Sequence, residues 1–266
     1  MSVSGVDDTW LSLHAEVVEL AKDEPTLASY LHATVINHDT LEDSLSYLLA
    51  SKLASPDLPA MSLRDVIGQV FVYSVDVRAA IRADLAAAVE RDPAAHGVAN
   101  PFLNHKGFHA LQGYRVSHWF WQKGRRALAL YLQSRLSEIF SVDIHPAAAI
   151  GSGIFIDHAT GVVVGETAVV EDGVSMLQEV TLGGTGKESG DRHPKIGRGV
   201  LLSAGAKILG NIRIGAYSKV GAGSVVLEDM PAHSTIVGVP ARVVGRCSSE
   251  EPASCMDQKL EASGDT

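Results

Sequence analysis

The chain has 266 residues, of which 46% are hydrophobic and 20% are charged, and its formal net charge is −9. A negative net charge gives no global support for nucleic-acid binding, and no apolar run approaches the roughly 20 residues of a membrane-spanning helix. The only two cysteines, Cys247 and Cys255, exclude a disulfide framework and suit a reducing cytoplasm. We therefore expect a cytoplasmic protein that binds neither nucleic acid nor a membrane.

Residues 1–141 are predicted to form an N-terminal α-helical domain, because apolar residues recur there at helical spacing. In TLEDSLSYLLASKL the leucines follow one helical stripe, and either Asp39 or Thr40 can serve as the N-cap. The later segment SLRDVIGQVF opens with Ser62 and has Asp65 three residues on, which approximates a capping box. The sequence thus predicts a helix start at each of these points.

From residue 142 onward the period of the sequence changes to six. Aliphatic or small residues recur every six positions over 144–180 and again over 196–226. This repeat is typical of hexapeptide parallel β-helices, in which three hexapeptides form one coil and the aliphatic side chains stack inside. We predict such a domain over 142–246. Ten extra residues interrupt the repeat at one place, so 183–195 is predicted to be an inserted loop.

The charge is unevenly distributed along the second half of the chain. From Gly183 to Arg246 there are nine Lys or Arg residues against four Asp or Glu residues. This excess fits a small polyanionic ligand, or simply a surplus of surface lysines. The following segment, 247–266, is polar and acidic, and we expect it to be a disordered tail.

Four stretches give the sequence a specific resemblance to a known family. They are NHKGFHALQGYRVSHWFWQKGRRALALYLQ, VDIHPAAAIGSGIFIDHATGVVVGETA, VTLGGTGKESGDRHPKIG and GVPARVVG. Together they are similar to the serine acetyltransferases, enzymes that make O-acetylserine for cysteine synthesis, and the resemblance covers residues 10–246. It implies an α+β fold, with the N-terminal α-helical domain followed by a left-handed parallel β-helix, usually in a dimer of trimers. It also implies acetyl-CoA as co-substrate, L-serine as acceptor and cysteine as feedback inhibitor.

The chemistry of acetyl transfer to an alcohol requires a base, since a hydroxyl is a poor nucleophile until its proton is removed. His158, in IDHATG, is the predicted base, because a neutral imidazole is available near neutral pH. Asp143, in SVDIHP, matches the family's partner carboxylate, which would orient the ring and stabilise the imidazolium.

The resemblance also implies how serine is held by its charged ends. Asp92 and Asp157 match the family's positions for the ammonium group. Arg192 supplies a planar guanidinium for the carboxylate, and His193 matches a substrate-site histidine beside it. Both lie in the inserted loop, which we expect to reach across to the His158 of a neighbouring subunit.

Five further positions are predicted to bind coenzyme A. Gly184 matches a backbone N–H contact to the thioester oxygen, and glycine allows a close approach because it has no Cβ. Ala204 and Ala222 would keep the pantetheine groove open, while Lys219 and Arg242 would meet the nucleotide phosphates. No metal is predicted.

Three alternatives remain at this stage. A γ-carbonic-anhydrase-like lyase uses the same scaffold and would bind zinc through His145, His158 and His193. Another hexapeptide acyltransferase would act on sugars or antibiotics. A third possibility is an assembly protein, since the family docks to O-acetylserine sulfhydrylase through a terminal isoleucine. This sequence ends at Thr266, so either the complex does not form or the native end lies beyond it.

Overall fold

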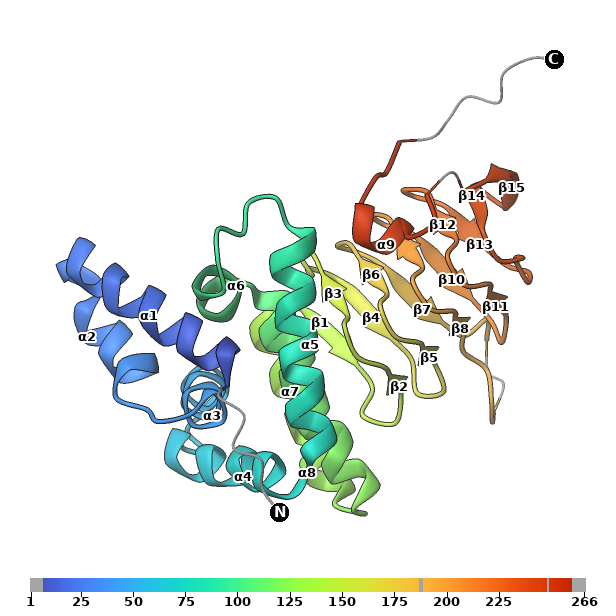
Figure 1. Cartoon of the computed structure of the whole chain (residues 1–266). Helices are drawn as coiled ribbons and strands as arrows, with labels where there is room; N and C mark the ends of the chain where they lie inside the picture. Colours follow the sequence, from blue (N-terminus) through green and yellow to red (C-terminus); the bar gives the residue numbers. More distant parts are fainter. Residues whose placement is uncertain (1–6, 187–188, 248, 260–266) are drawn as a thin grey trace, which may run out of the picture.

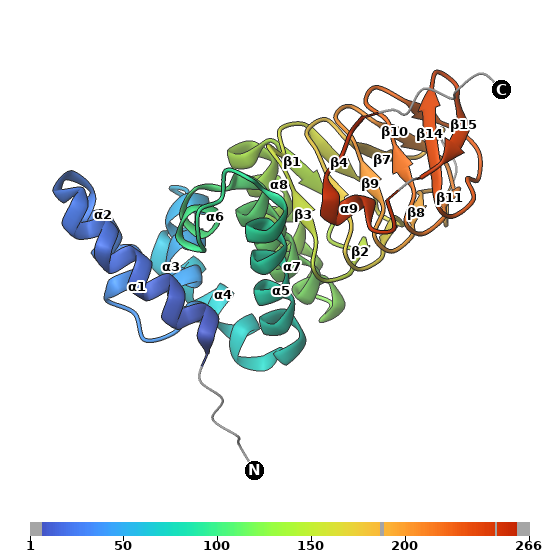
Figure 2. The ribbon, with the colours of Figure 1, turned by 45° about the horizontal axis from the view of Figure 1, so that its top comes forward.

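A computed structural model of the chain describes residues 7–186, 189–247 and 249–259. Helices occupy one end of an elongated molecule, and a stack of short strands extends away from them (Figure 1). The segment after the last strand folds back along the side of this stack (Figure 2). The predicted fold class, a helical region followed by a parallel β-helix of hexapeptide repeats, is confirmed.

Eight α-helices precede the strands in the described residues. Two irregular turns flank the short α2, a 3₁₀ turn at Pro25–Leu27 and a π-helical turn at His32–Ile36. None of the helices in the described part is long and apolar enough to cross a membrane. The bounds are α1 Asp8–Asp23, α2 Ala28–Leu31, α3 Leu41–Leu53, α4 Ala60–Tyr73, α5 Val75–Arg91, α6 Ala99–Asn104, α7 Lys106–Gln122 and α8 Arg126–Phe140.

The two predicted helix starts had different outcomes. Thr40 is the N-cap of α3, and its hydroxyl accepts a hydrogen bond from the Asp43 amide at 3.1 Å. The capping box at Ser62 is wrong, because α4 begins two residues earlier, after Pro59. Proline holds its φ at −63° and leaves the chain extended at ψ 155°, so the helix can begin at once without a side-chain cap.

The strands form three sheets that run side by side along the stack, and each of the first four coils contributes one strand to each sheet. In the first sheet the order is β1-β4-β7-β10-β13, in the second β11-β8-β5-β2, and in the third β15-β14-β12-β9-β6-β3. All pairs are parallel except β14 with β15, which forms an antiparallel hairpin on the last coil. The bounds are β1 Val142–Ile144, β2 Ala149–Ile150, β3 Phe155–Ile156, β4 Val162–Val164, β5 Val169–Val170, β6 Ser175–Met176, β7 Thr181–Gly183, β8 Lys195–Ile196, β9 Leu201–Leu202, β10 Lys207–Leu209, β11 Arg213–Ile214, β12 Lys219–Val220, β13 Val225–Val226, β14 Ser234–Gly238 and β15 Ala241–Arg246.

The register of the coils corrects the predicted repeat at one point. Ile144 pairs with Val164, not with Val162, so the chain from Ile156 to Val164 spans eight residues where the repeat predicts six. Two extra residues therefore lie between β3 and β4. As a result the inserted loop contains eight extra residues, since Leu182 is the true predecessor of Ile196. The repeat is interrupted twice, not once.

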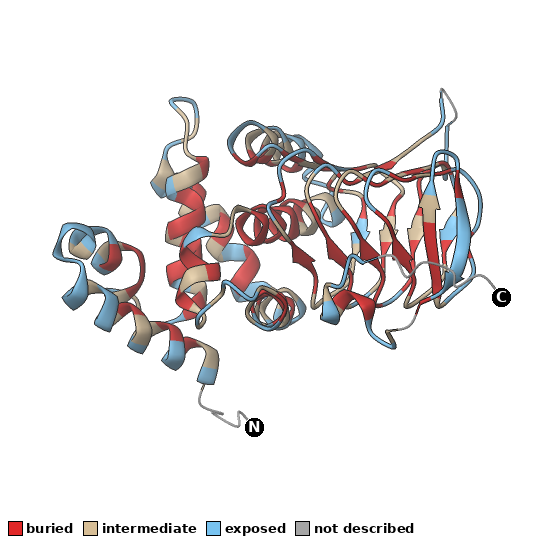
Figure 3. Ribbon diagram, turned by 90° about the horizontal axis from the view of Figure 1, so that it is seen from above, coloured by how far each residue is buried: buried red, intermediate tan, exposed pale blue. Residues whose placement is uncertain are grey.

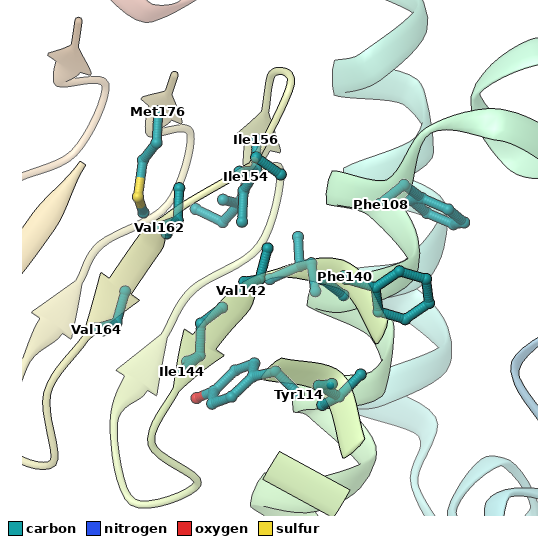
Figure 4. Close-up of a cluster of buried hydrophobic side chains, with 14 of the residues drawn as sticks. Phe108, Tyr114, Phe140, Val142, Ile144, Ile154, Ile156, Val162, Val164 and Met176 are labelled. Carbon is teal, nitrogen blue, oxygen red and sulfur yellow. The ribbon is translucent and has the colours of Figure 1, made fainter. Parts of the chain in front are cut away.

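The core of the β-helix continues into the helical end of the molecule. Tyr114 of α7 and Phe140 of α8 lie beside the strand residues Val142 and Ile144 of the first coil, and Phe108 of α7 belongs to the same buried cluster (Figure 4). Figure 3 shows buried residues running along the strands and on the helix faces that meet. The helices therefore close one end of the stack, and α7 is fixed directly against it.

The tail beyond Arg246 departs from the predicted disorder. Residues Pro252–Cys255 form a short helix, α9, and the Ser175 hydroxyl donates a hydrogen bond to the Ala253 carbonyl at 2.8 Å. Phe155 and Leu201 on the same sheet face outward yet are buried. The outward face of the third sheet, which carries these apolar and small residues, is the surface against which the tail packs. Residues 260–266 of the predicted tail lie outside the described part.

Candidate active site

Seven of the predicted site residues lie at two corners of the stack of three sheets, whereas Asp92 follows α5 and Asp143, Lys219 and Arg242 lie in strands. We call the turns that link the third sheet to the first the His158 corner, which comprises 157–161, 177–180, 203–206 and 221–224. The turns that link the first sheet to the second form the Arg192 corner, which comprises 145–148, 165–168, 184–194 and 210–212. The candidate site is therefore built from two separate edges of one chain.

His158 lies at the point where the two extra residues enter the repeat. Its backbone φ is 55°, and that of Ala159 is 62°. Two consecutive residues therefore adopt the left-handed conformation, which residues other than glycine rarely adopt. The Thr160 amide donates to the His158 carbonyl at 2.7 Å. This bulge projects the His158 side chain, which is 72% exposed, from the corner.

Asp92, Asp157 and His158 meet in a pocket of about 280 Å³. Asp92 follows the last residue of α5, and its Oδ1 accepts a hydrogen bond from the Ala94 amide at 2.8 Å. His158 Nε2 lies 3.7 Å from Asp157 Oδ2. The structure thus brings together three of the predicted residues from two different domains. The other lining residues are Asn104, His105, Lys106, Gly107 and Ile156.

The electrostatics of this pocket favour a bound cation. Burial raises the pKa of the Asp157 carboxyl, His158 opposes the rise, and the Asp92 charge adds to it. Two carboxylates that disfavour each other's ionisation gain most from a cation placed between them. The pocket is therefore suited to an ammonium group.

A close contact fixes the wall of this pocket. At Gly107, in the first turn of α7, a Cβ atom would lie 2.0 Å from the backbone oxygen of Ile156. Only glycine allows the helix to approach the end of β3 so closely. Asp157 and the start of α7 are therefore held in one position relative to each other.

Asp143 does not contact His158 within the chain. Its Oδ1 accepts a hydrogen bond from Gln133 Nε2 at 2.7 Å, and the carboxylate that faces the His158 ring belongs to Asp157. The pairing of His158 with Asp143 stays a prediction.

Arg192 and His193 lie at the other corner. The Thr167 hydroxyl accepts hydrogen bonds from both of their amides, at 3.0 and 3.1 Å, and lies 2.9 Å from His193 Nδ1. Arg192 Nη2 forms an ion pair with Glu166 Oε2 at 2.8 Å. Burial lowers the pKa of His193, which is only 7% exposed, and the Arg192 charge lowers it further. The end of the inserted loop is thus anchored to the neighbouring coil, at a different corner from His158.

Of the five predicted coenzyme A residues, three lie at these two corners, and Lys219 and Arg242 lie in β12 and β15. Ala204 and Ala222 lie in successive turns of the His158 corner, joined by a 2.8 Å hydrogen bond from the Gly223 amide to the Ala204 carbonyl. Gly184 lies at the Arg192 corner. The two basic residues predicted to bind the phosphates already have partners within the chain. Lys219 Nζ donates a hydrogen bond to the Lys259 carbonyl at 2.6 Å, and Arg242 forms an ion pair with Glu228 at 2.9 Å.

Comparisons with known proteins identify the chain's relatives. The family model "Serine acetyltransferase, N-terminal" matches residues 9–113, and the model "Bacterial transferase hexapeptide (six repeats)" matches 193–228. Serine acetyltransferase from Salmonella typhimurium is 55% identical over 97% of this chain and 94% of its own length. The chain belongs to the serine acetyltransferase family.

Two solved structures of the serine acetyltransferase family match closely. A serine acetyltransferase in complex with cysteine is 52% identical, with a TM-score of 0.93, over 95% of this chain and 98% of that one. The enzyme from Brucella abortus in complex with coenzyme A is 50% identical, with a TM-score of 0.90, over 92% and 98%. The two-domain fold and its likeness to this family therefore extend over nearly the whole chain.

Family membership also bears on the alternatives. A carbonic-anhydrase-like lyase and an acyltransferase of another family are both set aside by it. His145 and His193 lie at one corner of the chain and His158 at the other. Among the described residues, no group of three or more His, Cys, Asp or Glu side chains could hold a metal ion.

Sequence reasoning missed three residues that contact the predicted ones. His105 lines the pocket of Asp92, and Glu166 and Thr167 contact the end of the inserted loop. Each is polar and lies in a turn or between helices, so it contributes nothing to the periodicity. His105 could have been found from its place in NHKG next to a helix start, but nothing in the sequence indicates that it meets Asp92.

Proposed function

We propose that this chain is a serine O-acetyltransferase, which transfers the acetyl group of acetyl-CoA to the hydroxyl of L-serine and gives O-acetyl-L-serine and CoA. The observation that carries the proposal is the pocket in which an exposed imidazole, His158, borders two carboxylates, Asp92 and Asp157. A base beside a cation site suits a substrate that carries a hydroxyl and an ammonium group two carbons apart.

In the proposed mechanism His158 removes the hydroxyl proton as the serine oxygen attacks the thioester carbon. The resulting tetrahedral species collapses, the C–S bond breaks, and the imidazolium returns the proton to the CoA sulfur. A carboxylate next to the ring stabilises the imidazolium; Asp157 is placed for this within the chain, and Asp143 is the candidate that the family resemblance supplies.

Serine itself is held at both ends in this proposal. The ammonium group binds between Asp92 and Asp157, and the carboxylate binds Arg192 and His193. Because the two pairs lie at different corners, we propose that a site forms between two subunits of a homo-oligomer, a trimer or a dimer of trimers. Each subunit then contributes its His158 corner to one site and its Arg192 corner to another.

Coenzyme A would lie along the same inter-subunit groove. The Gly184 amide is the proposed donor to the thioester oxygen, and the small side chains of Ala204 and Ala222 leave space for the pantetheine arm. Lys219 and Arg242 are proposed to contact the phosphates. Lys219 can do so only if its hydrogen bond to Lys259 opens.

Regulation and compartment follow the same reasoning. Cysteine has the charged ends of serine with a thiol in place of the hydroxyl, so we propose that it inhibits competitively at the serine pocket. Both cysteines of the chain are free thiols, one buried and one exposed, which suits a cytoplasmic location.

The test is the release of free thiol from acetyl-CoA in the presence of L-serine, compared with L-threonine, a sugar and an aminoglycoside at equal concentrations. We expect release that depends on L-serine and is suppressed by cysteine. If serine supports no release and another acceptor does, the proposed substrate is wrong. If no acceptor supports release, the acyltransferase activity itself is wrong.

A further inference from the structure

His105 lies in the ammonium pocket, yet the proposed function gives it no task. It occupies the junction between α6 and α7, with φ −76° and ψ 106°, and its carbonyl accepts the His109 amide at 3.1 Å. Its side chain is 21% exposed. Because α7 is pressed against β3 at Gly107, the ring of His105 is held in place by a rigid element.

The ring faces one particular oxygen of Asp92. His105 Nε2 lies 3.5 Å from Asp92 Oδ2, whereas the other oxygen, Oδ1, accepts the Ala94 amide. Oδ2 is therefore the oxygen left for a ligand, and His105 stands beside it. The charged groups around the ring are Asp92 from the end of α5 and Asp157 and His158 from the turn after β3. Lys106 turns its ammonium group toward the Thr160 hydroxyl.

We propose that His105 is a positioning residue for Asp92, and that its protonation state decides whether the pocket accepts a primary ammonium group. This inference rests on the proposed function and goes beyond it. A neutral ring can donate from Nε2 to Oδ2 and orient it while leaving two carboxylate charges for one ammonium group. A protonated ring instead neutralises Asp92 and repels the incoming cation, so it acts as an internal competitor of serine and of cysteine.

The surroundings of His105 support a neutral ring near neutral pH. Burial lowers the pKa of His105, although Asp92 and Asp157 oppose the change. The affinity for serine should therefore fall as the pH drops through the pKa of this histidine. Asp157 also becomes protonated at a higher pH than an ordinary aspartate as the solution is acidified, because its pKa is raised. Variants of His105 are needed to separate the two groups.

The experiment compares His105→Gln, which keeps a donor but carries no charge, with His105→Lys, which carries a permanent charge. At pH 7.5 we expect His105→Lys to raise both KM for serine and the inhibition constant of cysteine by at least about tenfold, since a like charge in the pocket is strongly unfavourable. We expect His105→Gln to stay within about threefold of wild type and to lose most of the acid fall in serine affinity. For both variants kcat and KM for acetyl-CoA should change by less than about twofold, since His105 acts on binding alone.

His96→Lys is the matched control, because His96 is an exposed histidine in the loop just before α6. It should leave all four constants unchanged. Calorimetric titration of each protein with L-serine and with L-cysteine at pH 6.0 and 7.5 gives a readout that does not depend on turnover.

Three outcomes separate the inference from the function on which it rests. Active wild type with unchanged serine affinity in His105→Lys would overturn the inference and leave the proposed function intact. If the affinity of His105→Gln for serine still falls at low pH as in wild type, the inference is overturned and the pH dependence is assigned to Asp157. Wild type that neither acetylates nor binds serine would overturn both. Melting temperatures close to wild type exclude a folding defect, and if His105→Lys fails to fold, the pH profile of His105→Gln decides.

Discussion

At the scale of single residues, His158 stands out because its backbone is strained where its side chain is exposed. A left-handed histidine followed by a left-handed alanine persists only when the surrounding structure enforces it, and such strain tends to occur at functional sites. We predict that His158→Ala lowers kcat by about 10²–10⁴-fold, the usual contribution of a general base, while coenzyme A binds as in wild type. His233→Ala is the control, since His233 has the same left-handed φ of 55° at a different corner. Steady-state rates near wild type in His158→Ala would remove it from the mechanism.

Ionised Asp157, the form proposed to bind the ammonium group, is predicted to lower the stability of the folded state. Its pKa is raised in the folded chain, chiefly by burial and further by Asp92, so the folded state loses stability as the pH rises from about 4 through that raised value. Asp157→Asn should therefore melt at a higher temperature than wild type at pH 7.5, and the difference should shrink as the pH falls through the raised pKa toward about 4. The same variant should raise KM for serine. A lower melting temperature at pH 7.5 would contradict the assigned sign.

At the scale of elements, the sequence predicts the β-helix but not its register. In the first sheet two alternate positions are both apolar and buried, Val162 and Val164 in the second coil and Val180 and Leu182 in the third, so a six-residue count fits either column. In the structure Ile144 pairs with Val164, so Val164 and not Val162 lies in the column of Ile144. The helix start at Thr40 was predictable from its hydroxyl, whereas the start of α4 depends on the extended geometry of Pro59, which competes with the weaker signal of Ser62.

The inserted loop is the element whose removal should separate function from folding. Shortening it by deleting residues 187–191, of which 187 and 188 lie outside the described part, keeps Arg192 and His193 and removes no aliphatic residue, since the segment reads KESGD. We expect the melting temperature to stay within a few degrees of wild type, because the aliphatic columns remain. We expect kcat/KM for serine to fall about 10²-fold or more, since misplacement by an ångström can cost that much.

A second variant tests the same loop without changing its length. Thr167→Val removes the hydroxyl that holds both loop amides and should also raise KM for serine. Unfolding or loss of the oligomer in the shortened protein would mean that the loop is structural.

At the scale of the whole molecule, the family resemblance supplies the candidate residues and the expectation that the inserted loop reaches a neighbouring subunit, but not the contacts that each residue makes within the chain. The resemblance to the family named Asp92, Asp157 and His158, and they do share a pocket. It also named Arg192 and His193, which lie at another corner with Glu166 and Thr167. A list of residues carries no information on which edge of the stack each one occupies, because that depends on the lengths of the turns. His105 was missed for the same reason.

This division leads to a prediction about mixed oligomers. If each site combines the His158 corner of one subunit with the Arg192 corner of its neighbour, the two inactive variants His158→Ala and Arg192→Ala can complement each other. A site is intact when the subunit that contributes the His158 corner carries Arg192→Ala and the subunit that contributes the Arg192 corner carries His158→Ala. Random mixing in equal amounts leaves about one site in four intact over all oligomers, and selection for mixed trimers, each with one intact site of three, should restore about one third of wild-type activity.

The measurement is serine acetylation after the two variants are coexpressed with different tags and purified through both. Each variant purified alone is the baseline, and a coexpressed pair of wild-type chains with the same tags sets the full rate. Because every chain carries one of the two mutations, a site made within one chain is always inactive, so activity at the baseline in verified mixed oligomers would place the whole site on a single subunit. Recovery above the baseline requires that the two corners come from different chains.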